Sequence, residues 1–310
     1  MSWIEPGFKV IRYIGCITLC LQASLASANC PLLSDKTMAA ALSWNGIPKV
    51  GQVYKINNWH VQDGDSIRLK GSDRLRIGLI NTPEIGHSSR PDQAFAKQAK
   101  QHLNKRLKDY PSVYVKLLPQ KQDRYGRWLS QIYDGAGLSA EQGLVEQGLA
   151  YVISMNAQGA PECLWQSEFI ARNDGQGLWG HPSSKVVDAN YIDKNAGGFI
   201  RMEGIVTDIS DSQFDWYIGL GQRGGMRADV AVKISKAVLA NSRFRVSDQH
   251  ELKQWLGKSL QVRGWLAWRK ISEKQIQKGF RQGLMTLYHE DMLKLSSALG
   301  VDTASKFTIP

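Results

Sequence analysis

The chain is poor in cysteine and has no long apolar run. Only four cysteines occur among its 310 residues, which allows two disulfides at most. The most apolar stretch, residues 13–23, contains Gln22 and is followed by Ser24, so it is shorter than the ~20 residues that a membrane-spanning helix needs. We find no internal sequence repeat and no low-complexity tract, so a repeat array is not expected.

Acidic residues are in the minority. The 28 Asp and Glu residues face 39 Lys and Arg residues, which gives a formal net charge of +11 and a pI of about 9.4. A basic excess of this size favours a polyanionic partner, such as nucleic acid, an acidic surface or an acidic polysaccharide. Plain solubility is the alternative explanation. The hydrophobic content of 43% is sufficient for packed cores, and the length suggests two domains.

The N-terminus has the features of an export signal. Lys9 and Arg12 form a basic start, residues 13–23 are mostly apolar, and residues 26–28 fit the small-x-small cleavage rule. We therefore expect a Sec signal peptide over residues 1–28, cleaved near Ala28. The alternative is an uncleaved anchor. The prediction implies a periplasmic or secreted protein without stable membrane insertion.

Cysteine usage agrees with export. Cys16 and Cys20 lie in the predicted signal, so Cys30 and Cys163 remain. Two thiols in an oxidising compartment often pair, and closing a loop of this length would contribute about 4 kcal/mol. The alternative is two free thiols, one of them packed in a helix.

The first half of the chain predicts a small barrel with helices packed on it. After a lead-in at residues 29–49, strand patterns begin near Val53. Ser139 and Pro161 are expected at the starts of two later helices. Other expected elements are a hairpin at 66–70 and 74–80, a helix at 92–108, and a strand pair at 113–118 and 128–133. Five strands with interposed helices are typical of an oligonucleotide-binding (OB) barrel, which we assign to residues 50–180.

A second β domain is expected after a linker at residues 181–197. It covers residues 198–297, and residues 298–310 form a C-terminal tail. Expected strands are 199–206, 214–220, 228–234, 257–266 and 284–288, with a short helix at 252–256. The fold class is therefore mainly β with packed helices, as an OB-type five-stranded barrel followed by a second OB-like β-barrel.

Three short blocks combine carboxylates with arginines. They read Asp-Gly-Asp-Ser at residues 63–66, Arg-Ile-Gly-Leu-Ile-Asn-Thr-Pro-Glu at 76–84 and Asp-Arg-Tyr-Gly-Arg at 123–127. Carboxylates hold hard divalent cations, arginines clamp phosphates, and a glutamate can take a proton from water. Together they indicate metal-assisted cleavage of a phosphodiester.

These blocks resemble those of the staphylococcal nuclease (thermonuclease) family, which read D-G-D-[TS], R-[LI]-x-x-[IV]-D-T-P-E and D-x-Y-G-R. The resemblance covers about residues 50–180 and includes the ending Gly-Leu-Trp at 177–179. A block at 257–266 is similar to an OB-type barrel attached to some secreted bacterial nucleases. The resemblance implies a five-stranded barrel of the staphylococcal nuclease kind, with calcium as cofactor.

The resemblance implies a specific set of cation ligands. Asp65 would bind the cation directly, Asn81 would take the second ligand place and the carbonyl of Thr82 the third. Asp63 would lie outside the ligand set and orient bound waters. The family has aspartate where this chain has Asn81, so we expect weaker calcium binding. The departure leaves Mg²⁺, Mn²⁺ or a site without metal open.

The resemblance also assigns the catalytic groups. Arg76 and Arg127 would stabilise charge on the phosphate, and Glu84 would activate or orient the attacking water. Tyr125 matches a position near the bound nucleotide, where its ring can stack on a base. In the second domain, aromatics and basic residues on a barrel face would suit single strands, although core packing is the alternative for at least half of them. These residues are Trp216, Trp255, Trp265, Trp268, Arg263, Arg269 and Lys270.

The predicted function is that of a monomeric, periplasmic or secreted, calcium-dependent endonuclease with little sequence preference. By resemblance, it cuts DNA and RNA at the 5′ P–O bond and leaves 3′-phosphates. The alternative is a catalytically weak or inactive nuclease-fold protein that binds nucleic acid or a protein partner. A more distant alternative is a surface protein that binds acidic polysaccharide through charge alone.

Overall fold

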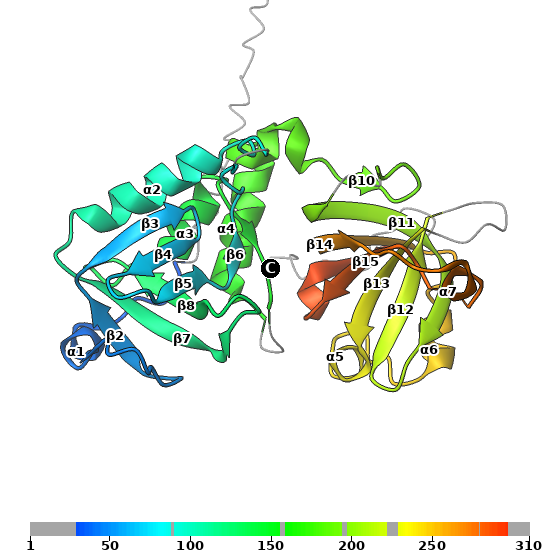
Figure 1. The fold of residues 1–310 in the computed structure, drawn as a ribbon, viewed down its shortest axis with the longest axis horizontal. Coiled ribbons are helices and arrows are strands. Elements are labelled where there is room, and N and C mark those ends of the chain that lie inside the picture. Colours follow the sequence, from blue (N-terminus) through cyan, green and yellow to red (C-terminus); the bar gives the residue numbers. More distant parts are fainter. Residues whose placement is uncertain are drawn as a thin grey trace, which may run out of the picture.

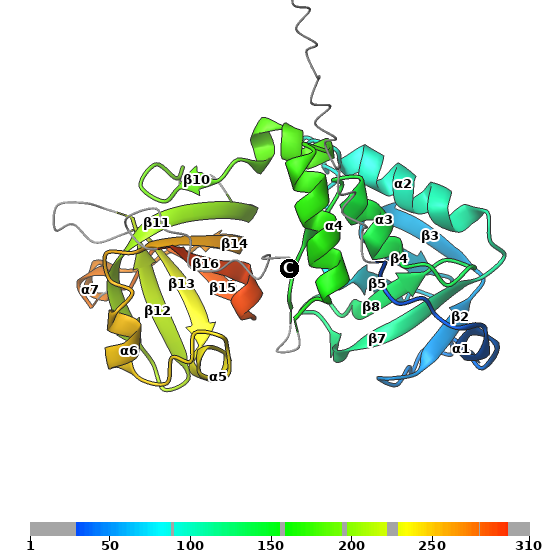
Figure 2. The same cartoon turned by 180° about the vertical axis from the view of Figure 1, so that it is seen from behind.

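The computed structural model describes residues 29–87, 90–155, 159–193, 197–221, 229–278 and 280–296. Within these ranges the chain forms two β-barrels that lie beside one another (Figures 1 and 2). None of the helices in these ranges is long and apolar enough to cross a membrane. The predicted signal peptide, residues 1–28, and the predicted tail, residues 298–310, lie outside the described residues.

The first barrel has the predicted OB-type strand order. Its sheet runs β1-β2-β7-β8-β5-β4-β3. Strands β2 and β3 follow one another directly, and they pair with opposite ends of the sheet, so one bent strand closes the barrel. Strands β5 and β8 are parallel, as the third and fifth strands of an OB barrel are. The strands are β1 (Leu42–Ser43), β2 (Val53–Ile56), β3 (Trp59–Asp63), β4 (Ser66–Leu69), β5 (Arg74–Ile77), β7 (Val113–Gln122) and β8 (Trp128–Tyr133).

Three helices and a short strand pair complete this half. They are α2 (Ala96–Lys108), α3 (Ala140–Glu146), α4 (Glu162–Asn173) and the pair β6 (Ile80–Asn81) with β9 (Tyr151–Val152). Helix α2 buries the predicted apolar stripe, which includes Leu103 and Leu107. Its predicted start at residue 92 is wrong, because Phe95 takes a left-handed conformation (φ 70°) and the helix begins after it. Ser139 caps α3 through the amide of Gln142, as predicted.

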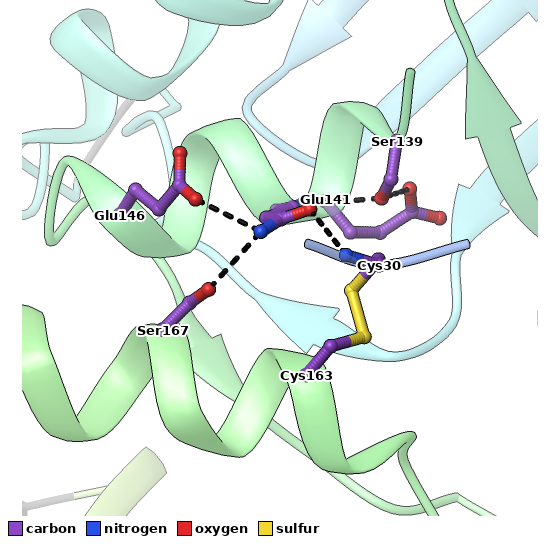
Figure 3. The surroundings of a disulfide bond; sticks show 7 residues. Cys30, Ser139, Glu141, Glu146, Cys163 and Ser167 are labelled. Carbon is purple, nitrogen blue, oxygen red and sulfur yellow. Dashed lines mark hydrogen bonds between the residues drawn. A yellow bond between two sulfur atoms is a disulfide. The ribbon is translucent and has the colours of Figure 1, made fainter. Parts of the chain in front are cut away.

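The lead-in is held by the disulfide. Cys30 and Cys163 are joined, with 5.2 Å between their Cα atoms (Figure 3). The amide of Cys30 also donates to Gln142 Oε1 of α3 at 2.9 Å. Helix α1 (Asp35–Ala39) and strand β1 follow, and the indole of Trp44 donates to Asp73. The predicted pair is thus formed, and it fastens the lead-in to α4.

The second barrel repeats the strand order of the first. Its sheet runs β10-β11-β12-β13-β15-β14-β16, and a further pairing of β11 with β14 closes five strands into a barrel. Strands β13 and β15 are parallel, as β5 and β8 are. The closed strands are β11 (Gly198–Asp211), β12 (Asp215–Leu220), β13 (Val230–Ser235), β14 (Ser259–Trp268) and β15 (Gly283–Leu287). The predicted second OB-like barrel is confirmed.

Short elements connect the two barrels and flank the second one. They are the 3₁₀ turns η1 (Gly177–Gly180), η2 (Pro182–Ser184) and η3 (Glu290–Met292), helices α5 (Lys236–Ala240), α6 (Gln249–Lys253) and α7 (Glu273–Gln277), and strands β10 (Val187–Asp188) and β16 (Leu293–Ser296). The helix predicted at 252–256 lies earlier because Asp248 and Glu251 form a capping box. The stretch expected as a linker, residues 181–197, includes β10, which pairs with β11.

The two barrels are joined by specific contacts. Helix α4 lies between them in both views (Figures 1 and 2). From α4, Glu168 accepts hydrogen bonds from Arg263 Nη1 of β14 at 2.6 and 2.7 Å. Ile153, just after β9, is buried in the core of the second barrel. The rings of Tyr151 and Phe199 lie 5.2 Å apart across the same junction.

Candidate active site

A tight turn between β3 and β4 fixes Asp65. Asp63 Oδ1 accepts from the amide of Asp65 at 3.1 Å. Between them, Gly64 lies so close to its neighbours that a Cβ would come within 2.6 Å of Ala99 Cβ and 2.7 Å of Thr82 Oγ1. Only glycine therefore fits, and the turn is pressed against both α2 and the loop after β6. As a result Asp65 is buried, at 2% exposure.

Asp65 is the centre of a buried polar cluster. Its Oδ2 accepts from the amide of Thr82 at 3.0 Å and lies 2.8 Å from Arg76 Nη1. Its Oδ1 accepts from Ser66 Oγ at 3.3 Å. Burial raises the pKa of Asp65 to about 7, Arg76 opposes that shift, and the nearby negative charge of Asp63 adds to it.

The side chain of Arg76 bridges two predicted cation ligands. Besides Asp65, its Nη2 donates to Asn81 Oδ1 at 3.1 Å. Its Nη1 also donates to the carbonyl of Ile80 at 3.0 Å. Asn81 in turn donates through Nδ2 to the carbonyl of Thr82 at 3.3 Å. The oxygens of Asp65 and Asn81 thus contact one guanidinium group, and the carbonyl of Thr82 is linked to it through Asn81.

The donor set is compatible with a hard divalent cation. It offers one carboxylate, one amide oxygen and one carbonyl, all of which Ca²⁺ accepts in proteins. In the described part of the chain, no group of three or more His, Cys, Asp or Glu side chains could hold a metal. A cation here would therefore depend on the neutral oxygens of Asn81 and Thr82, and it would share Asp65 and Asn81 with Arg76.

Glu84 reaches the same cluster from the loop after β6. Gln93 holds that loop in place: its Oε1 accepts from the amide of Glu84 at 2.8 Å, and its amide donates to the carbonyl of Glu84 at 3.0 Å. Glu84 is exposed to solvent, but partial desolvation of its carboxyl and the charge of Asp63 raise its pKa, and Arg76 and Arg127 oppose the shift. A carboxylate with a raised pKa is better suited to proton transfer near neutral pH.

Arg127 is held over the cluster by two side chains. Its Nε donates to Asp123 Oδ2 at 2.8 Å, and its Nη1 donates to Ser66 Oγ at 3.1 Å. Although burial acts in the opposite direction, hydrogen bonds from Arg127 and the amide of Tyr125 hold the pKa of Asp123 below its usual range. Sequence reasoning assigned no role to Asp123 or Ser66. Both residues could have been identified from the sequence, because Asp123 begins the third block and Ser66 ends the first block at the start of β4.

Tyr125 lies on the rim of the site. It is 56% exposed, and its ring carries the guanidinium groups of Arg124 and Arg127 at 4.7 and 5.7 Å from the centroid. Arg124 Nη2 donates to the Tyr125 hydroxyl at 2.6 Å, and Arg74 Nη2 donates to its carbonyl at 2.8 Å. Tyr125, with its exposed ring, is therefore contacted by three arginine side chains.

A cleft of about 1290 Å³ opens over these residues. The predicted residues Arg76, Asn81, Glu84, Tyr125 and Arg127 all line it, whereas Asp65 lies beneath its floor. Positive charge dominates its lining, with six arginines against two carboxylates. These are Arg74, Arg76, Arg90, Arg124, Arg127 and Arg269 against Glu84 and Asp123.

The predicted site residues converge, but the sequence did not predict the opposite wall. That wall is formed by the second barrel, from the start of β11, the end of β14, and β15 with the residue that follows it. Its lining residues include Phe199, Trp265, Leu284 and Tyr288. They come from positions more than 70 residues beyond the third block, so only the packing of the two barrels brings them to the cleft.

Comparison with known proteins agrees with this geometry. A family model described as staphylococcal nuclease homologue matches residues 74–181. That range includes the second and third blocks, and the first block lies just before it.

Two curated relatives cover part of the chain. An uncharacterized protein of Bacillus anthracis is 30% identical over 126 residues, which is 39% of this chain and 58% of that protein. Endonuclease YhcR of Bacillus subtilis is 27% identical over 131 residues, which is 38% of this chain and 11% of that protein. The matches thus cover less than two thirds of either relative. The chain therefore carries a domain of the staphylococcal nuclease homologue family at residues 74–181, and a nuclease-type function is supported.

Proposed function

We propose that this protein is a calcium-dependent endonuclease, exported to the periplasm or secreted, that hydrolyses DNA and RNA with little sequence preference. One observation carries the proposal. The carboxylate of Glu84 and the guanidinium groups of Arg76 and Arg127 meet beside buried Asp65 at one cleft. The excess of arginine in that cleft complements a polyanionic chain, and the protein acts as a monomer.

The residues supply a direct hydrolytic route. Glu84 orients a water and takes its proton while the water oxygen forms a bond to phosphorus. The bond between phosphorus and the 5′ oxygen breaks, and a proton passes to that oxygen, which leaves a 3′-phosphate and a 5′-hydroxyl. Arg76 and Arg127 donate to the phosphoryl oxygens as negative charge grows there, which lowers the barrier.

The proposed cation site is made of Asp65, Asn81 and the carbonyl of Thr82, with Asp63 orienting bound water. Calcium, when bound, would act as a Lewis acid on a phosphate oxygen. Mg²⁺ or Mn²⁺ are the other candidates, because the set carries one formal charge fewer than the family pattern. Fewer charged ligands lower the affinity for calcium.

Export is supported by the Cys30–Cys163 disulfide. Such bonds persist in oxidising compartments and are rare in the cytosol. The predicted signal peptide at residues 1–28 supports the same export to the periplasm or the medium. Mass spectrometry of the protein from a periplasmic fraction and from the medium tests this, with an N-terminus near residue 29 as the expected result.

A metal series tests the activity. Supercoiled plasmid and a single-stranded RNA are incubated with the mature protein in Ca²⁺, Mg²⁺ or Mn²⁺, or in a chelator. We expect cutting of both with Ca²⁺, none with chelator, and 3′-phosphate ends on the products. Equal cutting in chelator would overturn the role of the cation, and 5′-phosphate ends would overturn the assigned bond.

A second candidate is a nuclease-fold protein that binds nucleic acid or a protein partner without cutting. The bridging of Asp65 and Asn81 by Arg76 favours it, since the guanidinium occupies oxygens that a cation would need. Absence of cutting with every divalent metal, together with a gel shift of DNA, would select this alternative.

A further inference from the structure

We propose that the cleft-facing wall of the second barrel is a binding subsite for single-stranded nucleic acid, continuous with the cleavage site. We call this wall the aromatic wall and define it by Phe199, Trp265, Leu284 and Tyr288, all of which line the cleft. The inference rests on the proposed function in one respect, namely that the strand bound by the aromatic wall is the substrate of the nuclease site.

Strand register sets which side chains face the cleft. Phe199 of β11 pairs with Trp265 of β14, and Ala267 pairs with Leu284 of β15. Side chains alternate along a strand, so the neighbours Leu266 and Met285 point into the core and are buried. The alternation leaves Phe199, Trp265 and Leu284 on the outer surface of three strands, and Tyr288 follows directly after β15.

The rings of the aromatic wall are accessible. Tyr288 is 43% exposed, while Trp265 and Phe199 are partly buried, with ring centroids 5.1 Å apart in an edge contact. By contrast, Trp216 and Trp255 are buried in the second core, so the core-packing alternative holds for them. Tyr288 thus presents its ring to a ligand, and Trp265, which also packs against the second core, presents the part of its ring that remains accessible.

The two sides of the cleft differ in chemistry in a way that suits one polymer. The first barrel contributes five of the six lining arginines, and the second contributes Arg269 and the rings. A nucleic acid strand carries phosphates along one edge and flat bases along the other. Phosphates can therefore contact the arginine side while bases stack on the aromatic side.

The arrangement discriminates between single and double strands. Bases in a duplex are stacked inside and show only their edges, so they cannot lie flat on Trp265 or Tyr288. Unpaired bases can, and each stacked base contributes about 1–3 kcal/mol. A neutral or basic peptide could use the apolar side chains of the wall but would gain nothing from a cleft with this excess of positive charge.

Binding without cleavage is the direct test. Fluorescence anisotropy is measured in chelator with a labelled 12-mer of thymidylate and with a 12-base-pair duplex. We expect Trp265→Ala and Tyr288→Ala each to weaken single-strand binding by about 5–100-fold and to change duplex binding by less than about twofold. Trp265→Phe keeps a ring and should recover most of the affinity.

Two controls sharpen the result. Phe214→Ala removes a 68% exposed ring of the same barrel that does not line the cleft, so it should leave both affinities unchanged. Thermal melting of each variant checks the fold, and Tyr288→Ala guards against a folding defect of the partly buried Trp265.

The outcomes separate this inference from the proposed function. Unchanged single-strand binding in both variants, or an equal loss for duplex, would overturn the subsite while leaving the nuclease proposal intact. Weaker single-strand binding in both variants, together with a wild-type protein that binds single strands but cuts nothing, would support the subsite and reject the cleavage.

Discussion

At the scale of single residues, Arg76 is the central group of the candidate site. It neutralises buried Asp65 and also contacts Asn81, so it takes part in both the fold and the proposed chemistry. Arg127 differs, because Asp123 and Ser66 hold its guanidinium group at the rim, where it lines the cleft. Variants of Arg127 and Asn81 can therefore report on activity without the loss of a buried ion pair.

Replacing Arg127 should harm catalysis far more than stability. Arg127→Ala removes a donor to the developing charge, and such losses reduce kcat by about 10²–10³-fold. We expect a stability change of no more than about 1 kcal/mol, because the ion pair with Asp123 is partly exposed. Steady-state kinetics and urea unfolding measure the two effects. Arg124→Ala is the neighbouring control, and an equal fall in kcat there would argue against a special role for Arg127.

Restoring the family's aspartate should strengthen calcium binding. Asn81→Asp adds a charge to the ligand set, so the calcium concentration at half-maximal activity should fall by about tenfold or more. Asn104→Asp makes the same charge change on the exposed face of α2 and serves as the control. Calcium titration of both variants decides the matter, since an unchanged midpoint in Asn81→Asp would remove this residue from the ligand set.

The buried carboxyl of Glu141 should make stability depend on pH. Burial raises its pKa from 4.5 to about 7, although the amide of Ile132 and the hydroxyl of Ser139 donate to it. A raised folded-state pKa means that the folded protein binds an extra proton. The contribution is therefore fully present below pH 4.5 and is lost as pH rises through about 7.

Glu141→Gln does not titrate and retains an acceptor for Ile132. Between pH 5 and pH 8 the wild type should lose up to about 3 kcal/mol of unfolding free energy relative to this variant. Urea unfolding at both pH values gives the difference. The same pH slope in both proteins would mean that Glu141 keeps an ordinary pKa.

At the scale of elements, the structure joins pieces that the sequence presented separately. The alternating patterns at 66–70 and 74–80 predicted the hairpin of β4 and β5, and the stripe on α2 was found where expected. Strand β3 was missed, because Trp59–Asp63 has weaker alternation and is stabilised by pairing with β4. Strand β16 was missed too, since it is short and depends on β14 for its hydrogen bonds.

The disulfide should be the main support of the lead-in. It closes a separation of 133 residues between the segment before α1 and helix α4. Reduction, or the variant Cys163→Ser, should lower the unfolding free energy by about 4 kcal/mol. Urea unfolding with and without reductant measures this, and reductant should not affect the Cys163→Ser variant. A loss below about 1 kcal/mol would show that the lead-in is held mainly by other contacts such as Trp44 with Asp73.

At the scale of the whole molecule, the junction between the barrels builds the cleft. Glu168 is buried, at 4% side-chain exposure, and Arg263 supplies its counter-charge from the second barrel. Arg263 also lies 5.2 Å from the Trp165 ring and donates to the carbonyl of Val152. This ion pair holds the aromatic wall opposite the arginine side.

Removing one member of that pair should loosen the junction. Arg263→Ala leaves the charge of Glu168 buried without a partner, which costs about 3–5 kcal/mol. Differential scanning calorimetry should then resolve two transitions in place of one, as the barrels lose their coupling. Lys236→Ala removes an exposed ion pair with Asp211 and should cost at most about 1 kcal/mol. A similar small change in Arg263→Ala would show that apolar contacts alone set the junction.

The sequence by itself determined the local chemistry of this protein. The pattern of alternating residues specified most strands. A hairpin and its adjoining turn bring the first two blocks together because those blocks are close in the chain, whereas the third block reaches them through the pairing of β5 with β8. The tertiary structure alone decided that Arg76 bridges Asp65 and Asn81, and that the second barrel supplies the opposite wall of the cleft. The first of these contacts depends on how the turn before β4, strand β5 and the loop after β6 pack within one barrel. The second depends on how the two barrels dock, and no local pattern encodes the relative position of segments that pack against each other only after each has folded.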